Sequence, residues 1–378
     1  LQYVSLEKNE ALIMPALQAF LPVVYLLASV GECWEANFFE LGTVNYGHLI
    51  SAHPWIRQQE EEKMRYAMQE VGFMVLTNHG IRKHIMDDMW NQTREFFATT
   101  KENKEAVYQT KDYSYGYSAD EVLAATEEIE YFKNATGKAG NADAAPHSMV
   151  NDQKEMFAAW IGAPNTNRLD NVLWPEEPVR MKEAWVAYYR ECEKIAAQLL
   201  RSFASILDLE QDYFEPFIDD HMSAIRALSY PPQSKENPAP EGSLRCSAHS
   251  DYGTFTLLRQ DGVGGLQLDI GNEEWVDVIS DHYDFIVNLG NTMKMWTNDR
   301  YKSTRHRVVN PRNEREAARR QSIAFFHNLN GNARVETFPS CKYENGTSKY
   351  QPVIFLDFLN SLIHSSQTNY KMDAKSEL

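Results

Sequence analysis

The stretch His249-Ser250-Asp251-Tyr252-Gly253-Thr254 leads directly into an apolar segment, and His306 lies in a later segment that also has a strand pattern. Side chains two positions apart on a β-strand point to the same face, so His249 and Asp251 can hold one metal ion together. With His306 from another strand they form a two-histidine, one-carboxylate set, which holds one face of Fe(II) and leaves three positions open for chemistry. The histidine–aspartate pair alone is weak evidence, because short motifs arise by chance.

Strand periodicity also groups a second set of polar side chains. Arg320 and Ser322 are two positions apart, so they present a guanidinium and a hydroxyl on one face, where the guanidinium can bind a carboxylate through two parallel hydrogen bonds. Phe326 shares that face. On an earlier segment, Arg226 and Tyr230 share a face by the same spacing. The sequence therefore predicts a carboxylate-binding group in addition to the metal site.

The hydrophobic period changes along the chain. A helical stripe of apolar residues from Met181 to Phe203 predicts a long helix that lies on a flat surface. From His221 to about Asn328 the period becomes two, in short segments separated by Gly, Pro, Asn and Asp. The switch predicts an α+β fold, in which a helical N-terminal layer packs on a double-stranded β-helix, or jelly-roll, core.

These patterns divide the chain into five regions: an uncertain N-terminal segment (1–37), an N-terminal region (38–160), a region around the long helix (161–220), the jelly-roll core (221–330), and a C-terminal helix and tail (331–378).

Several local elements follow from the same patterns. We expect a strand over 38–50, a surface loop or lid over 134–150, and a mostly apolar helix over 350–363. The apolar spacing over 64–71 predicts a helix, whose charged run Glu60-Glu61-Glu62-Lys63 is expected to face solvent.

Four motifs occur in an order that resembles the isopenicillin N synthase-like branch of the Fe(II)/2-oxoglutarate dioxygenases. They are Gly72–Ile81, Asp152–Phe157, Ser229–Pro232, and the His249, Asp251 and His306 set followed by Arg320-Gln321-Ser322. The resemblance runs from about Phe38 to about His364. One departure is Asn291, where relatives usually have Asp after the Gly; since Asn caps a turn or helix about as well as Asp, we expect the fold to survive.

The resemblance implies an enzyme of secondary metabolism that uses Fe(II), 2-oxoglutarate and O2 and releases succinate and CO2. Its substrate would be a small, anionic or carbonyl-rich metabolite, which it would hydroxylate, desaturate or cyclise oxidatively. The implied iron ligands are His249, Asp251 and His306, and the implied 2-oxoglutarate ligands are Arg320, Ser322 and Tyr230. The implied substrate contacts are Arg226, Tyr252, Phe326 and Tyr115. No catalytic acid, base or nucleophile beyond the metal site is expected.

Other interpretations stay open at this point. An iron-dependent oxidase of the same family could dispense with 2-oxoglutarate, and a catalytically inert binding module could use the same fold, since fold does not fix function. Arg226 could form an internal salt bridge, and Tyr115 could pack as an ordinary loop residue. His79 lies at a strand-to-helix turn, so we expect it to make structural hydrogen bonds and leave it out of the metal site.

Composition limits the partners and the compartment. The formal net charge of −16 argues against nucleic acid and anionic membranes, which attract basic surfaces, and leaves a small-molecule substrate and a monomer as the expectation. The cysteines form no C-x-x-C pair, which favours reduced thiols in the cytoplasm; they are Cys33, Cys192, Cys246 and Cys341. The alternative is the endoplasmic reticulum lumen, because an apolar run over 11–31 and the ending Lys375-Ser376-Glu377-Leu378 are similar to targeting signals.

Overall fold

The computed structural model describes residues 41–362, apart from 111–114, 120–151, 167, 235–237, 241–242 and 273. The N-terminal segment, the loop expected over 134–150 and the C-terminal tail therefore lie outside the described residues.

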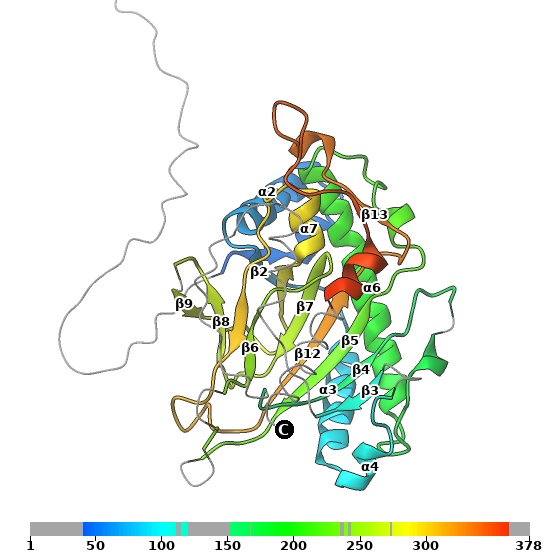
Figure 1. Ribbon diagram of the computed structural model, residues 1–378, viewed down its shortest axis with the longest axis vertical. Helices are drawn as coiled ribbons and strands as arrows, with labels where there is room; N and C mark the ends of the chain where they lie inside the picture. Colours follow the sequence, from blue (N-terminus) through cyan, green and yellow to red (C-terminus); the bar gives the residue numbers. More distant parts are fainter. Residues whose placement is uncertain are drawn as a thin grey trace, which may run out of the picture. The chain divides into compact units, whose positions relative to one another are not determined.

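Two β-sheets form the centre of the described structure (Figure 1). The larger sheet has, in spatial order, β1 (Thr43–Asn45), β2 (Phe73–Thr77), β10 (Phe285–Leu289), β7 (Phe255–Gln260), β12 (Arg320–His327), β5 (Ala224–Tyr230), β4 (Glu155–Ala159) and β3 (Gly116–Ser118). The smaller sheet has β6 (Cys246–His249), β11 (His306–Val308), β8 (Leu266–Asp269) and β9 (Trp275–Asp277). Neighbouring strands are antiparallel except for the parallel pair β1 and β2.

Helices surround these sheets. The long ones are α2 (Pro54–Glu70), α3 (Lys83–Ala98) and α6 (Met181–Ile206); the short ones are α1 (Tyr46–Leu49), α4 (Lys101–Glu105), α7 (Asn291–Trp296) and the helical residues 355–362. Single 3-10 turns cover Leu169–Asn171, Glu215–Phe217 and Pro339–Cys341. Among the described helices, none combines the length and apolar character that spanning a bilayer requires.

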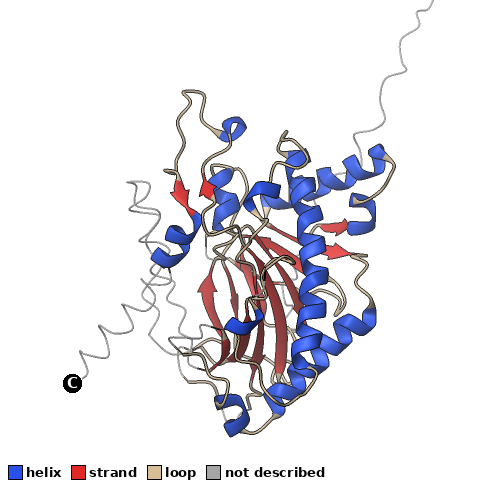
Figure 2. Ribbon diagram, turned by 90° about the vertical axis from the view of Figure 1, so that its right-hand side faces the viewer, coloured by secondary structure: helices blue, strands red, loops and turns tan. Residues whose placement is uncertain are grey.

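Alternate side chains along the strands of the larger sheet point to opposite faces, and each face packs into a different hydrophobic core. One face packs on the helices, and in Figure 2 the long helix runs along the strands. This contact buries aromatic and aliphatic side chains from both sides, including Trp185, Tyr188, Phe203, Ile225, Leu257, Ile323 and Phe325. The other face turns towards the smaller sheet, and the core between the sheets includes Leu228, Tyr230, Leu266, Leu268 and Val308. Residues of opposite parity on one strand therefore belong to different cores, as expected for two packed sheets.

The charged run of α2 is a correction to the sequence interpretation. Glu60 and Glu61 are 2% and 7% exposed, so this part of the run does not face solvent. Glu60 accepts hydrogen bonds from the backbone N–H of Asn45 (2.7 Å) and from Lys63 (3.0 Å), while Glu61 accepts one from the Ser205 hydroxyl (2.9 Å). Buried carboxylates need such partners, and these two obtain theirs largely from other elements.

Three element boundaries also differ from expectation. Within 38–50, the described strand is limited to β1, because the Asn45 side chain accepts a hydrogen bond from the His48 N–H and starts α1. The C-terminal helix starts at residue 355, since β14 (Val353–Ile354) first pairs with β13 (Arg334–Val335). Asn291 is the first residue of α7, and Gly290 takes the N-cap position.

Candidate active site

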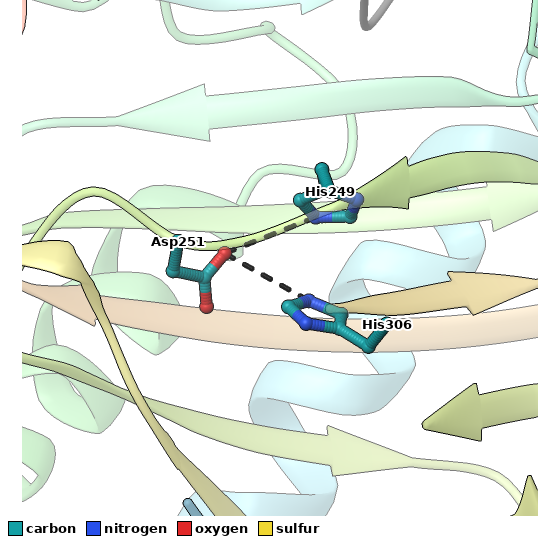
Figure 3. Close-up of side chains that lie close together, drawn as sticks. All are labelled: His249, Asp251 and His306. Atoms are coloured by element: carbon teal, nitrogen blue, oxygen red, sulfur yellow. Dashed lines mark ion pairs between the residues drawn. The ribbon is translucent and has the colours of Figure 1, made fainter. Parts of the chain in front are cut away.

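Two strands of the smaller sheet and the turn after β6 bring the metal-binding set together (Figure 3). His306 on β11 lies directly opposite His249 on β6, and Asp251 follows the end of β6 by two residues. The Nε2 atoms of the two histidines each lie 3.8 Å from the Asp251 Oδ1, and the ring centroids are 4.3 Å apart. One potential ligand atom from each residue lies within 4.8 Å of the others. The arrangement can hold a single ion.

Hydrogen bonds orient all three side chains. The Nδ1 atom of His249 lies 2.8 Å from the Ser247 carbonyl, and that of His306 lies 3.3 Å from the Thr304 carbonyl. These contacts orient each Nε2 atom towards the Asp251 carboxylate, and metal-binding histidines are usually fixed in this way.

Asp251 is held from the opposite side. Its Oδ2 atom accepts hydrogen bonds from the Thr256 hydroxyl (2.5 Å) and the Asn288 amide (2.6 Å), so Oδ1 stays directed at the histidines. Burial opposes ionisation, but the adjacent His306 and His249 and the two hydrogen bonds together lower the pKa of Asp251 below its ordinary value. The side chain is therefore anionic at neutral pH and could serve as a metal ligand.

The turn that carries Asp251 is closely packed. A Cβ atom at Gly253 would lie 2.4 Å from the His327 carbonyl oxygen, and one at Gly290 would lie 2.3 Å from the Gly253 carbonyl oxygen. The backbone N–H of Asn291 donates to the Asp251 carbonyl (2.8 Å). Glycine is needed at both positions because the backbones approach too closely for a side chain.

Arg320 forms a separate polar group between the sheets. It is 1% exposed and lies opposite Tyr230 in the β12–β5 register, with its guanidinium carbon 4.9 Å from the centroid of that ring. Its Nη1 and Nη2 atoms donate to the Ser322 hydroxyl (3.3 Å) and the Gln260 side-chain oxygen (3.0 Å). Burial raises the pKa of Tyr230 to about 12, so this tyrosine keeps its proton at neutral pH.

This group has the properties of a carboxylate site. Within the described residues, no Asp or Glu forms an ion pair with Arg320, and its Nε atom makes no hydrogen bond. A buried guanidinium without an anion is costly. The carboxylate of a 2-oxo acid would supply both the missing charge and the missing acceptor.

Two of the four predicted substrate contacts, Arg226 and Phe326, lie on one face of the larger sheet, and Tyr115 packs against the helix-facing core. Arg226 lies opposite Ala324 in the β5–β12 register, and its guanidinium carbon is 5.6 Å from the Phe326 ring centroid. Burial raises the pKa of Tyr115, and the positive charge of Arg226 partly offsets this shift, which places the two side chains within electrostatic range. The backbone carbonyl of Tyr252 accepts hydrogen bonds from the N–H and the hydroxyl of Thr292, which fix the backbone at this position.

The metal set and Arg320 connect through one strand. On β7, Thr256 lies opposite Phe326 and supports Asp251, while Gln260 lies opposite Ser322 and supports Arg320. Four residues of strand span about 13 Å. Sequence reasoning missed Thr256, Gln260 and Asn288. The period-two spacing of β7 could have indicated the first two, whereas Asn288 has no local signal.

His79, which was left out of the metal site, and two arginines on either side of His306 bind other groups. His79 places Nε2 2.6 Å from the Tyr283 carbonyl, and its Nδ1 accepts from the Ile81 N–H. The guanidinium groups of Arg305 and Arg307 lie over the Trp275 ring.

A jelly-roll core with a two-histidine, one-carboxylate set is typical of mononuclear non-haem metal enzymes. Comparison with known proteins narrows this class. Residues 219–329 match the 2OG-Fe(II) oxygenase superfamily, and residues 44–177 match the family described as non-haem dioxygenase in morphine synthesis N-terminal.

Individual relatives agree. The chain is 29% identical to proline hydroxylase buaE of Petromyces alliaceus, over 82% of this chain and 94% of that protein. It is 30% identical to a 2-oxoglutarate-dependent dioxygenase of Didymella fabae, over 75% and 85%. A full-length Neurospora crassa protein, crystallised in complex with alpha-KG and thymine, superimposes with a TM-score of 0.71 and 27% identity, over 87% of this chain and 96% of that chain.

The chain therefore belongs to the 2-oxoglutarate- and Fe(II)-dependent oxygenase superfamily. It is an oxidoreductase whose metal is Fe(II) and whose co-substrates are 2-oxoglutarate and O2. The predicted α+β jelly-roll fold and dioxygenase class are confirmed.

Proposed function

We propose that this enzyme oxidises a small, anionic or carbonyl-rich metabolite at an iron ion held by His249, Asp251 and His306. Their shared geometry supports the ligand assignment, since each offers a ligand atom to one position. When bound, iron together with 2-oxoglutarate supplies the oxidising power for O2 chemistry and yields succinate and CO2. The side chains of this chain bind, orient and shield the reacting groups.

Arg320, Ser322 and Tyr230 bind the far carboxylate of 2-oxoglutarate in this proposal. The supporting observation is the buried Arg320 guanidinium, which is aligned by Ser322 and Gln260 but has no anionic partner among the described residues. Tyr230 adds an aromatic face beneath the guanidinium and a hydroxyl that stays protonated. An iron oxidase that does not use 2-oxoglutarate would have no need of this group.

The substrate class rests on Arg226 and its aromatic neighbours. A half-buried guanidinium that lies over Phe326 and within electrostatic range of Tyr115 can pair with an anion or a carbonyl oxygen, and the Phe326 ring can cover a planar face. The Neurospora crassa protein of similar fold was crystallised with thymine, which is a planar molecule with two carbonyl groups. We assign Arg226, Tyr252, Phe326 and Tyr115 to the substrate pocket. Hydroxylation, desaturation and oxidative ring closure are all compatible with this pocket.

The remaining parts of the proposal concern the assembly and the compartment. We propose a monomer in the cytoplasm that binds neither nucleic acid nor membrane. The net charge of −16 and the reduced thiols of Cys192 and Cys341 support this. Light scattering coupled to gel filtration would contradict the monomer if the measured mass were a multiple of the chain mass.

The experiment that tests the function is succinate release across a panel of small metabolites. Purified enzyme receives Fe(II), 2-oxoglutarate and O2 with one candidate at a time. Anionic and carbonyl-rich compounds should raise succinate formation above the substrate-free rate, and the His306→Ala variant should show no increase. Stimulation confined to neutral compounds without carbonyl groups would overturn the substrate class. Absence of the visible charge-transfer band when Fe(II) and 2-oxoglutarate are added anaerobically would overturn the co-substrate assignment.

A further inference from the structure

A second buried arginine, Arg245, lies near Arg320 at the end of the proposed site that would bind the far carboxylate of 2-oxoglutarate. Arg245 immediately precedes β6 and is 1% exposed. Its Nη2 atom donates to the carbonyls of Pro231 (3.2 Å) and Ala318 (3.0 Å). Pro231 follows Tyr230, and Ala318 precedes Arg320 by two residues. The guanidinium of Arg245 therefore joins the ends of β5 and β12 where Tyr230 and Arg320 face each other.

Arg245 has an unbalanced charge in this position. Its hydrogen bonds go to the two backbone carbonyls, no carboxylate of the described residues forms an ion pair with it, and its Nε atom makes no hydrogen bond. Burial lowers the pKa of Arg245, and the positive charge of Arg320 lowers it further. Asp261 and Glu316 act only at longer range, and each binds other groups: Asp261 accepts from the Gln321 N–H, and Glu316 accepts from Arg312.

Two buried guanidinium groups within electrostatic range of each other, neither paired with a carboxylate of the described residues, are costly to the fold. Arg259 is a buried arginine of the same fold that does have a carboxylate partner. It is fully buried on the helix-facing side of the larger sheet and donates to backbone carbonyls, but it has Asp87 at 3.8 Å. Arg259 obtains a negative partner from the protein, whereas an anionic ligand could supply one to Arg245 and Arg320.

We propose that Arg245 is a specificity-determining residue, which together with Arg320 selects a 2-oxo acid with a second, fully ionised carboxylate at its far end. This inference rests on the proposed 2-oxoglutarate site and deepens it. Arg245 acts through the electrostatic potential at the end of the site and through the positions of Tyr230 and Arg320. Its charge favours a dicarboxylate over a monocarboxylate of the same chain length, because a neutral methyl end gains nothing from a second cation.

The test compares the binding of two 2-oxo acids by anaerobic calorimetry on the Fe(II)-loaded enzyme. 2-Oxoglutarate carries the far carboxylate, and 2-oxopentanoate has a methyl group in its place. Arg245→Gln should raise the Kd of 2-oxoglutarate about tenfold and that of 2-oxopentanoate less than about threefold, so the ratio of the two values falls. Arg245→Lys keeps the charge and should hold the ratio within about twofold of wild type.

Arg259→Gln is the matched control, since it removes a buried arginine that also donates to backbone carbonyls. It should leave the ratio unchanged. Equal changes of both Kd values in Arg245→Gln, or no change in either, would show that Arg245 has only a structural role and would overturn the inference. If Arg245→Gln does not fold, the lysine variant decides, and a lost preference there contradicts the role of charge. Failure of the wild type to bind 2-oxoglutarate would instead refute the proposed function.

Discussion

Removal of the Thr256 hydroxyl tests how Asp251 is prepared for the metal. Thr256→Val replaces the hydroxyl by a methyl group of similar size, so the strand and its packing should remain. Asp251 then keeps the hydrogen bond from Asn288 but loses the one from Thr256, which is 2.5 Å long. A hydrogen bond to a charged group contributes about 1.5–3 kcal/mol. If most of this acts on the metal-binding conformation, the Kd for Fe(II) should rise roughly 10- to 100-fold.

The assay is anaerobic Fe(II) titration, followed by turnover at saturating iron. Turnover should recover largely once iron is saturating, because the three proposed ligands are still present. Thr254→Val is the control: Thr254 is also buried on this segment, but its hydroxyl binds His327 rather than Asp251. This variant should lower stability without changing the Kd for Fe(II). An unchanged Kd for Fe(II) in Thr256→Val would refute the idea that the second oxygen of Asp251 sets the ligand geometry.

Other predictions address the three parts of the site. His306→Ala should lower the affinity for Fe(II) and abolish turnover while circular dichroism stays close to wild type; retained turnover at limiting iron would contradict the ligand assignment. Arg320→Lys should raise the KM for 2-oxoglutarate much more than the KM for the primary substrate, since lysine lacks the planar fork; equal increases would argue against the carboxylate role. Arg226→Met should keep the anaerobic charge-transfer band but form succinate slowly without oxidising the substrate, whose affinity should fall about 10- to 100-fold. Loss of folding or iron binding in that variant would identify a structural ion pair.

The sequence predicted the parts of the site that depend on local spacing. His249 and Asp251 are two residues apart, and Arg320 and Ser322 share one strand face, so strand period alone grouped them. Strand period could not predict which strands become neighbours in a sheet. Asn288 reaches Asp251 because β10 lies beside β7, a pairing between segments that are distant along the chain.

The errors have the same origin. Glu60 looked like part of a solvated helix face because helical period reports only which residues share a side. Its burial depends on the backbone of Asn45 and the side chain of His48, which come from the preceding segment. The environment of Arg245 could not be predicted either, because this side chain binds the ends of two strands that come together only in the fold.

The pairing of His249 with His306 across β6 and β11 has a consequence for the lifetime of the protein. These strands are four and three residues long, and their register shifts between His306 and Val308. An ion bound to both histidines would act as a cross-link between them, and a ligand that binds only the folded state stabilises that state by an amount that grows with the logarithm of its free concentration above the Kd. We therefore expect the smaller sheet to be less stable in iron-starved cells, where proteases would cleave it faster. Iron supply would then affect the amount of this enzyme as well as its rate.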